Sequence, residues 1–594
     1  MPETDERQPR QSSDSLWDVT AGFRLRYLAA IISMGIGTLF LLLVPYLLKS
    51  ALDSLTQPAT TIRNVLLPVA LMVVGLNLLN GIFTYLRGRW AAQASEGIVQ
   101  RLRNRLYSHI EKLPAKYFDH ADTGDIVQRC SSDVETIRVF MASQVVEIAK
   151  VSLLLIVGIP IMFAQDVRMS LISLGSFPIL IGFAYFFYQK IRELFVKVDE
   201  SEARLSTVIQ ENLTGIRVVR AFAQQEYEHN KFNAANNEFR DLEMNLFRGL
   251  ALFWSISDVA VLFQLGVVLI AGGYFVIAGE LTIGAWVFFW WMVQTIIWPV
   301  RQIGRVVADS SRAGVAIGRI NAILHEPEES IEPQPVSAVA GDIEINNLTF
   351  GYNAEDPVLH DLSLNIKSGE TIAILGPPGS GKSTLIKLLL RLYDYETGSI
   401  KIGGTEINSI NRQAVRNSFG VVLQDPFLYS KSVKDNIVLG RSDAAHYDIE
   451  ECARAADIHG NIVEFQDGYE TVIGERGVTL SGGQRQRLAI ARAILKEPTF
   501  LILDDSLSAV DTKTESHILE ALEKRHGQQT TILIAHRLSS TRLADRIYVF
   551  DHGRIVQSGT HEELLNMEGS YQRLWSIQGV LDDEINAVLS GDES

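Results

Sequence analysis

The chain has 594 residues, and its 54 lysines and arginines against 69 aspartates and glutamates give a formal net charge of −15. This acidic balance excludes a general nucleic-acid binder, which needs a basic face. The two cysteines exclude a disulfide-rich scaffold and a cysteine-based zinc site, and the 47% of hydrophobic residues excludes a wholly disordered chain.

Residues 1–26 precede the first apolar stretch. Residues 1–15 are polar and mixed in charge, and they lack the basic start and the small-residue cleavage site of a signal peptide. We therefore expect that nothing is removed here. Residues 16–26 (LWDVTAGFRLR) are expected to form an amphipathic elbow helix along the membrane surface.

Six apolar stretches follow, and each is a candidate for a membrane span. A bilayer-spanning helix needs about 20 apolar residues. The stretches carry few charges and are residues 28–48, 65–86, 151–163, 171–188, 250–278 and 283–300. The third is shorter and reaches full length only if residues 140–150 extend it. The sequence therefore predicts an α-helical membrane domain with six transmembrane helices over residues 27–325, placed in the plasma (inner) membrane.

Basic residues cluster in two of the connections between these stretches. Residues 87–129 and 190–231 are rich in lysine and arginine, whereas the other connections are short and nearly bare of basic residues, at 53–62, 164–167 and 279–282. Basic connections remain on the cytoplasmic side of a membrane, so we expect both termini there. Both segments are helical in pattern. They are therefore either separate soluble insertions or long cytoplasmic extensions of the spanning helices.

A segment rich in proline and glutamate, residues 326–340 (EPEESIEPQPVSAVA), indicates a linker between domains. Over residues 341–580, short β-branched runs alternate with helical ones, which predicts an α/β domain. Residues 581–594 form an acidic C-terminal tail. The expected order is therefore a membrane domain followed by an α/β domain.

The α/β domain contains a Walker A motif of the P-loop NTPases. A buried strand is expected at residues 371–375, followed by the loop GPPGSGKST and an apolar helix at 385–392. The glycines let backbone N–H groups point at phosphates, and the helix start adds its positive dipole end. Lys382 supplies a cation to the terminal phosphates, and the Ser383 hydroxyl is a ligand for Mg²⁺. The candidate nucleotide-binding residues here are Gly376, Gly379, Ser380, Gly381, Lys382, Ser383 and Thr384.

Two further motifs follow the loop. Residues 500–505 (FLILDD) have the pattern of a buried strand ending in carboxylates, a Walker B arrangement in which Asp504 would hold Mg²⁺ through water. Between the two Walker motifs lies LSGGQ, residues 480–484, ahead of an apolar helix. Its Ser481, Gly482 and Gly483 resemble a second anion cradle at a helix start.

LSGGQ between Walker A and Walker B resembles the signature of ATP-binding cassette (ABC) proteins. The membrane half ahead of the cassette resembles the exporter class of that family over essentially the whole chain. The resemblance implies ATP-driven transport, with ATP and Mg²⁺ as cofactors. It also implies that the signature acts on nucleotide held by a second cassette, so that a second exporter half is needed as partner. The residues acting in trans would be Ser481, Gly482, Gly483 and Gln484.

Other family elements occur in the family's order. Tyr352 resembles the aromatic residue that stacks on adenine, and Gln424 resembles the Q-loop glutamine that contacts Mg²⁺ and water. His536 resembles the switch histidine that contacts the γ-phosphate. The resemblance also covers an exporter-specific loop, a D-loop and two cytoplasmic turns that dock on the cassettes, at residues 474–477, 508–511, 113–126 and 211–216 respectively.

One residue departs from the family pattern. The residue after the Walker B aspartate orients the attacking water and is usually Glu, but here it is Asp505. The side chain is one methylene shorter, and a misplacement of about 1 Å can cost a factor on the order of 10² in rate. Asp505 is either a tolerated variant in a slow homodimer or the mark of a degenerate site in a heterodimer. In the second case this chain's own site binds ATP but hydrolyses it poorly, while its signature completes the partner's site.

The substrate is less defined than the nucleotide site. Aromatic residues of the last span could bind lipophilic compounds or face lipid, and these are Phe288, Phe289, Trp290, Trp291 and Trp298. Polar residues near the spans could line a cavity or be structural, with Glu147 and Lys150 spaced to pair with each other; the others are Asn77, Asn80, Asp258, Gln264 and Gln294. We expect export of a hydrophobic or amphipathic small molecule. The alternatives are lipid flipping, siderophore-type uptake on the exporter fold, and an ATP-gated channel or regulatory membrane protein.

Overall fold

The computed structural model describes residues 20–55, 62–329, 339–353, 356–474, 477–535 and 539–577. The chain divides into two compact units. Unit 1 comprises Met1–Lys112 and Ala121–Glu326, and unit 2 comprises Leu113–His120 and Pro327–Ser594. Most of the expected elbow helix and the acidic tail lie outside the described residues. Residues 20–23 form a turn before the first helix of unit 1.

Unit 1 is a bundle of long helices. Its main helices are α2 (Arg24–Leu55), α3 (Ile62–Ile110), α7 (Val145–Gln165), α8 (Val167–Leu174), α9 (Phe177–Thr214), α11 (Gln225–Ile277) and α12 (Ile283–Leu324). Shorter helical pieces lead into α7 and connect α9 with α11; these are α5 (Thr123–Gln128), η1 (Arg129–Asp133), α6 (Val134–Val139), η2 (Phe140–Gln144) and α10 (Ile216–Ala221). Six helices of the described chain are long and apolar enough to cross a membrane, which confirms the six predicted spans.

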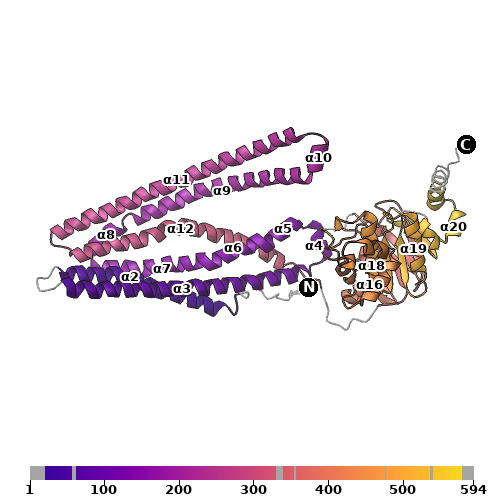
Figure 1. The fold of residues 1–594 in the computed structure, drawn as a ribbon, viewed down its shortest axis with the longest axis horizontal. Coiled ribbons are helices and arrows are strands. Elements are labelled where there is room, and N and C mark those ends of the chain that lie inside the picture. The colour runs from indigo at the N-terminus through magenta and orange to yellow at the C-terminus, as the bar shows by residue number, and fades with distance from the viewer. Residues whose placement is uncertain are drawn as a thin grey trace, which may run out of the picture. The chain divides into compact units, whose positions relative to one another are not determined.

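The helices of unit 1 extend well beyond the length of a span. The helix α3 has 49 residues and α11 has 53, whereas about 20 residues cross the hydrocarbon core. Figure 1 shows α9 and α11 running side by side to the short helix α10. The basic segments are therefore continuations of the spanning helices, and the interpretation as separate soluble insertions is wrong.

The main core of unit 1 is built from apolar side chains of α12 together with others from α2, α7, α8, α9 and α11. Phe288 and Phe289 of α12 are fully buried in this core, packed with Met292 and Leu154. These two phenylalanines therefore face neither lipid nor a substrate cavity, which corrects both interpretations offered from the sequence. Trp298 is 55% exposed.

The polar residues of the spans are mostly paired within unit 1. Lys150 and Glu147 lie 3.3 Å apart, which confirms the predicted pairing along the helix. The Gln264 amide donates to the backbone carbonyls of Ile172 and Ser173. Asn77 donates to a carbonyl of its own helix. These side chains are satisfied structurally, since a polar group without a partner in an apolar interior is costly.

Unit 2 contains two sheets. The larger has the strand order β10-β9-β3-β8-β7-β6, in which β10 alone is antiparallel to its neighbour. Its strands are β3 (Thr371–Leu375), β6 (Phe419–Val422), β7 (Phe500–Asp504), β8 (Thr530–Ile534), β9 (Arg546–Asp551) and β10 (Arg554–Gly559). The smaller sheet is antiparallel, with the order β2-β1-β4-β5: β1 (Ile343–Phe350), β2 (Leu359–Ile366), β4 (Thr397–Ile402) and β5 (Thr405–Glu406). The predicted α/β class is confirmed.

Helices pack on the larger sheet and bury its faces. The α-helices of unit 2 are α4 (Ala115–His120), α13 (Lys382–Leu389), α14 (Arg412–Ser418), α15 (Val433–Val438), α16 (His446–Ala455), α17 (His459–Glu464), α18 (Gly482–Leu495), α19 (Thr512–Glu523) and α20 (His561–Leu565). Short 3₁₀ turns are η3 (Ile407–Ser409), η4 (Gly468–Glu470) and η6 (Ser539–Leu543). The helix α4 is joined to this unit by a hydrogen bond from the Tyr393 hydroxyl to Asp119.

The packing of α11 against α12 gives a test of unit 1. A Cβ at Gly272 would lie 2.2 Å from Cδ1 of the Trp286 ring, whereas a Cβ at Gly266 of the same helix meets nothing within 4 Å. Gly272→Ala should therefore lower the thermal unfolding midpoint of the detergent-purified protein, with an overpacking cost of about 1–3 kcal/mol. Gly266→Ala is the matched control and should be neutral or slightly stabilising, because alanine favours a helix. Equal midpoints for the two variants would contradict the described packing.

Candidate nucleotide-binding site

The loop after β3 has positive φ angles at three glycines, and at two of them a Cβ would also clash with neighbouring atoms. Gly376 and Gly381 have φ angles of 153° and 96°. A Cβ at Gly376 would lie 2.4 Å from the Phe550 carbonyl oxygen, and one at Gly381 would lie 2.5 Å from Leu359. Gly381 is the residue that caps α13, so the expected helix begins at Lys382 and not at residue 385. The loop thus ends at a helix N-terminus, where an anion is favoured.

Lys382 lies inside this loop. Its Nζ donates to the carbonyl oxygens of Gly376 and Pro377, both at 2.8 Å. Burial lowers the pKa of Lys382, and the nearby charges of Asp504 and Asp505 oppose that shift. The ammonium group is therefore held at the centre of the loop, where it can meet the phosphates of a nucleotide.

Oxygen donors for a cation lie beside the lysine. The Ser383 hydroxyl donates to Oδ2 of Asp504 at 3.2 Å, which joins the first turn of α13 to the end of β7. Mg²⁺ prefers oxygen ligands and commonly takes one or two from the protein, with phosphate and water completing the shell. Ser383, Asp504 and the amide oxygen of Gln424 form a donor set that suits this ion.

These groups line one cleft of about 270 Å³ in unit 2. Its lining residues are Val358, Pro378, Gly379, Gly381, Lys382, Ser383, Thr384, Gln424, Asp504 and Asp505. The structure therefore brings most of the predicted Walker A residues together with both Walker B carboxylates and the Q-loop glutamine. Val358 was not predicted, because an isolated valine ahead of a strand carries no sequence signal.

Asp505 is fixed by its backbone and engaged by its side chain. It has φ 48°, in the left-handed region, and its N–H donates to the Ile534 carbonyl at 3.0 Å. The Gln424 amide donates to Oδ2 of Asp505 at 3.2 Å. The carboxylate that would orient water is thus in contact with the Q-loop residue.

Tyr352 lies near the loop and is 38% exposed. Its hydroxyl is 3.3 Å from the Thr384 hydroxyl, and Nζ of Lys387 lies 5.0 Å from the ring centroid. The predicted stacking of adenine on this ring stays a prediction. No sequence pattern marks Lys387, whose cation is held over the Tyr352 ring by a cation–π contact.

The signature motif is built separately from the cleft. Ser481 caps α18: its hydroxyl accepts from the Gln484 N–H at 3.2 Å, and the Gln484 side chain accepts from the Ser481 N–H at 2.9 Å. Ser481 is exposed, and none of the four residues 481–484 lines the described cleft. A Cβ at Gly483 would lie 2.9 Å from the Ala509 carbonyl of the D-loop segment. His536, Glu475 and Arg476 lie outside the described residues, so their predicted roles stay predictions.

Comparison with known proteins decides the family. Residues 27–300 match the ABC transporter transmembrane region, and residues 359–508 match the ABC transporter cassette. YgaD of Bacillus subtilis, provisionally named a multidrug export ATP-binding/permease protein, is 35% identical over 91% of this chain and 94% of its own.

The chain belongs to the ABC transporter family. YknU of the same organism, an uncharacterized ABC transporter ATP-binding protein, is 36% identical over 86% of this chain and 88% of its own. The structure of a bacterial Atm1-family ABC exporter with ATP bound superposes with a TM-score of 0.81 at 27% identity, over 94% of this chain and 99% of that one. The predicted resemblance is confirmed: this ABC transporter has the exporter fold, and it binds and hydrolyses ATP to drive transport.

The position of Lys382 gives a test of the nucleotide site. Lys382→Ala removes the cation held at the centre of the loop and should weaken ATP binding by roughly 10- to 100-fold, the size expected for loss of a charged hydrogen bond. The measurement is an equilibrium titration of the purified protein with a fluorescent ATP analogue. Lys367→Ala, at an exposed position of the same unit, is the control and should leave affinity unchanged. Unchanged ATP affinity in Lys382→Ala would show that this loop does not bind the phosphates of ATP.

Proposed function

We propose that this chain is one half of a dimeric exporter that moves a hydrophobic or amphipathic small molecule out of the cell by alternating access. The observation that carries the proposal is the separation of the two ATP-contacting parts. The described cleft holds the Walker residues but none of residues 481–484, whose Ser481 is exposed. Because the signature residues do not line the cleft of their own chain, they are available to contact a nucleotide that a second cassette binds.

The end of the α9–α11 arm supports a second chain. Leu213, Val218 and Phe222 lie at or beside α10 and are 66%, 60% and 72% exposed. Apolar side chains gathered on an exposed helix end favour contact with another protein. These residues include part of the second cytoplasmic turn expected from the sequence, which in the exporter resemblance docks on a cassette.

The site chemistry supports Mg²⁺ with ATP. Ser383, Asp504 and Gln424 would hold the ion, which when bound neutralises phosphate charge as the γ-phosphate leaves. Lys382 binds the terminal phosphates, and the signature residues of the partner's cassette close the other side. Closure of the two cassettes would be transmitted through the long helices of unit 1 to the membrane spans. Hydrolysis of ATP would then return the spans to their starting conformation.

Asp505 supports a heterodimer over a homodimer. Its backbone is fixed by the bond to Ile534, and its side chain contacts Gln424 at 3.2 Å. A shorter carboxylate on a fixed backbone cannot advance toward the water that Glu would reach. The intact Ser481-capped signature, in contrast, remains suited to complete a partner's site. We therefore propose that this chain's site binds ATP and turns it over slowly, while the partner chain carries Glu.

The export direction and the membrane follow the same proposal. The provisional name of YgaD describes multidrug export, and the spans with long basic extensions favour cytoplasmic cassettes and termini in the inner membrane. ATP-dependent accumulation of a substrate inside sealed inside-out vesicles containing the purified complex tests this directly. Accumulation is expected with intact Lys382 and should be absent in Lys382→Ala. ATP-driven loss from the vesicles would instead indicate uptake, and ATP-gated ion flow without accumulation would indicate a channel.

Steady-state ATPase of the complex tests the catalytic asymmetry. Replacing the partner's Glu should nearly abolish turnover, because its site does most of the hydrolysis. Asp505→Ala should cost far less, since its site contributes little. Ser481→Ala and Gly483→Asp should be severe, because they cripple the productive site in trans, and at Gly483 any side chain meets the Ala509 carbonyl.

The converse substitution gives the matched control. Asp505→Glu restores the longer carboxylate and should raise the ATPase turnover of the complex. Combined with replacement of the partner's Glu, Asp505→Glu should keep the complex active. The contrary result would be a homodimer of this chain with robust ATPase activity that Asp505→Ala abolishes. That result would show that Asp505 is a working base. The degenerate-site proposal would then be wrong.

A further inference from the structure

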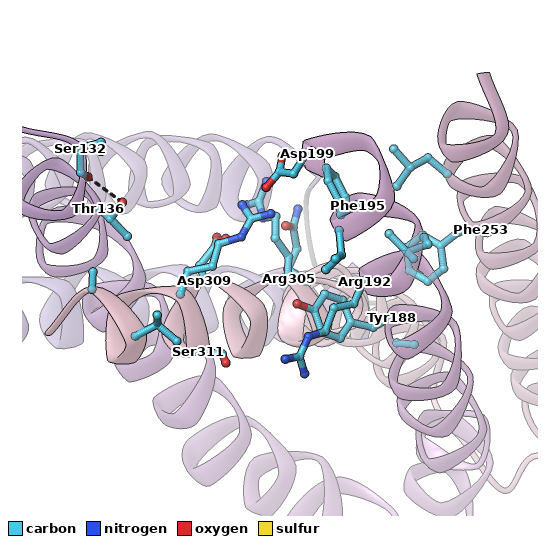
Figure 2. Close-up of a pocket in the computed structure, with 18 of the residues that line it drawn as sticks. Ser132, Thr136, Tyr188, Arg192, Phe195, Asp199, Phe253, Arg305, Asp309 and Ser311 are labelled. Carbon is cyan, nitrogen blue, oxygen red and sulfur yellow. Dashed lines mark hydrogen bonds between the residues drawn. The ribbon is translucent and has the colours of Figure 1, made fainter. Parts of the chain in front are cut away.

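Unit 1 contains a cavity of about 740 Å³, and none of its lining residues belongs to the nucleotide-binding cleft. It lies between α9, α11, α12 and the segment η1–α6, where the helices pass from their apolar spans into the long extensions. Figure 2 shows aromatic side chains of α9 and α11 on one side of it, Phe195 and Phe253 among them, and Ser132 and Thr136 on the other. The lining therefore combines aromatic side chains with a polar wall of charged and hydroxyl side chains, to which α9 also contributes through Arg192 and Asp199.

The polar wall is rich in arginine. Five arginines line the cavity against three aspartates, an excess of two positive charges. Four of the five lie on α12, at Arg301, Arg305, Arg312 and Arg319. Their spacings of four, seven and seven residues place them along one face of the helix. The fifth, Arg192, comes from α9.

The aspartates are partly engaged by other groups. Asp133 lies 3.6 Å from Arg319, and Asp309 accepts from the Gln144 amide at 2.8 Å. The second carboxylate oxygen of Asp133 is buried and has no described partner, but the balance of the wall remains cationic. Asp258 lies outside the lining but pairs with Arg301. Five arginines therefore face four aspartates, and one arginine charge remains in excess.

Arg301 is the buried member of the five arginines. Its side chain is only 4% exposed, and Nη1 donates to Asp258 at 2.6 Å. The guanidinium lies over the rings of Trp254 and Trp298, at 4.8 and 5.2 Å from their centroids. Its Nε and Nη2 are buried and donate to no described residue. A buried cation with unused donors, at the end of a membrane span, is costly unless an acceptor arrives.

An acceptor that satisfies Arg301 must be an anion with an apolar body. A carboxylate, sulfonate or phosphate matches the planar donors of a guanidinium. The rings of Phe253 and Trp254, which line the same cavity, suit an aromatic or aliphatic body. A lipophilic cation would instead place its charge beside an arginine-rich wall, where like charges repel.

We propose that this cavity binds the transported substrate and that the substrate is an amphipathic organic anion, with its acidic group at Arg301 and Arg305 and its apolar body against Phe253 and Trp254. The proposal rests on the proposed export function and names the substrate class for it. Arg301 and Arg305 are specificity-determining residues, which select the charge of the cargo.

Binding of two dyes with one scaffold tests the proposal. Carboxyfluorescein and rhodamine 123 share a xanthene body and differ in charge, the first anionic and the second cationic. We expect the anion to bind the full-length protein in phosphatidylcholine nanodiscs at least about fivefold more tightly, measured by fluorescence anisotropy without nucleotide. Arg301→Gln and Arg305→Gln should each weaken anion binding by roughly tenfold, the size expected for loss of one charged hydrogen bond, and should leave the cation unaffected or bound more tightly.

Two controls keep the result interpretable. Arg240→Gln alters a 62% exposed arginine of α11 outside the cavity, which pairs with its neighbour Asp241, and should change neither dye. Because Arg301→Gln leaves Asp258 without its partner, the double variant Arg301→Gln/Asp258→Asn removes both charges. It should retain the thermal midpoint of the parent while losing selectivity for the anion. Equal binding of the two dyes, or unchanged anion affinity in Arg305→Gln and the double variant, would overturn the proposal.

The lipid composition distinguishes two sources of the anion. Nanodiscs with added phosphatidylglycerol supply an anionic headgroup. If this lipid displaces carboxyfluorescein and Arg305→Gln abolishes the displacement, the natural anion is a lipid headgroup; without displacement it is a free organic anion. Because these assays use no ATP, selective binding without transport in vesicles would reject the export function alone. Transport of a substrate without anion selectivity would reject the cavity assignment alone.

Discussion

The carboxyl ends of β3 and β7 meet at one edge of the larger sheet because both strands run parallel to β8, which lies between them. The loop that follows β3 holds Lys382 and Ser383, and β7 ends at Asp504. Parallel strands thus place a phosphate loop and a carboxylate at hydrogen-bond distance, although 121 residues separate Ser383 from Asp504 in the chain. The chemistry of the cassette depends on this register, since a strand of opposite direction would carry its carboxylate to the far edge.

The nucleotide half could be predicted from the sequence because its signals are local. The predicted strand at 371–375 has the bounds of β3, because a five-residue apolar run with β-branched residues, followed at once by a glycine loop, favours a strand over a helix. The start of α13 was placed three residues late, because Gly381 caps the helix through a backbone conformation that the apolar pattern does not record. Val358 and Lys387 reach the site through tertiary packing, and no local sequence pattern predicts their positions.

The membrane half was predicted only in outline, because the hydropathy of a span does not fix which face packs where. Phe288 and Phe289 are as apolar as a lipid-facing pair, yet both lie in the core. The arginine face of α12 escapes a hydropathy-based prediction for a related reason: hydropathy marks the span up to residue 300, and the arginines beyond it carry no hydropathy signal. On this face, Arg301 is buried in contact with two indole rings and with Asp258. Such an arrangement lowers the cost of the charge without using all of its donors.

The loss of the Walker B glutamate is compatible with an intact signature because the two lie on separate elements. Asp505 is held at the end of β7 by its N–H bond to Ile534, and the Ser508 hydroxyl donates to its carbonyl at 2.9 Å. Two backbone contacts therefore prevent the chain from advancing to compensate for a shorter side chain. The signature is organised by its own capping box at Ser481 and Gln484. The D-loop contacts the same helix through the bond from the Ala509 N–H to the Gln486 side chain. A substitution that shortens the carboxylate can thus impair one composite site while the part supplied to the other remains intact. In a symmetric homodimer both sites would carry the same defect, and only two different chains allow one of the sites to keep its full catalytic set.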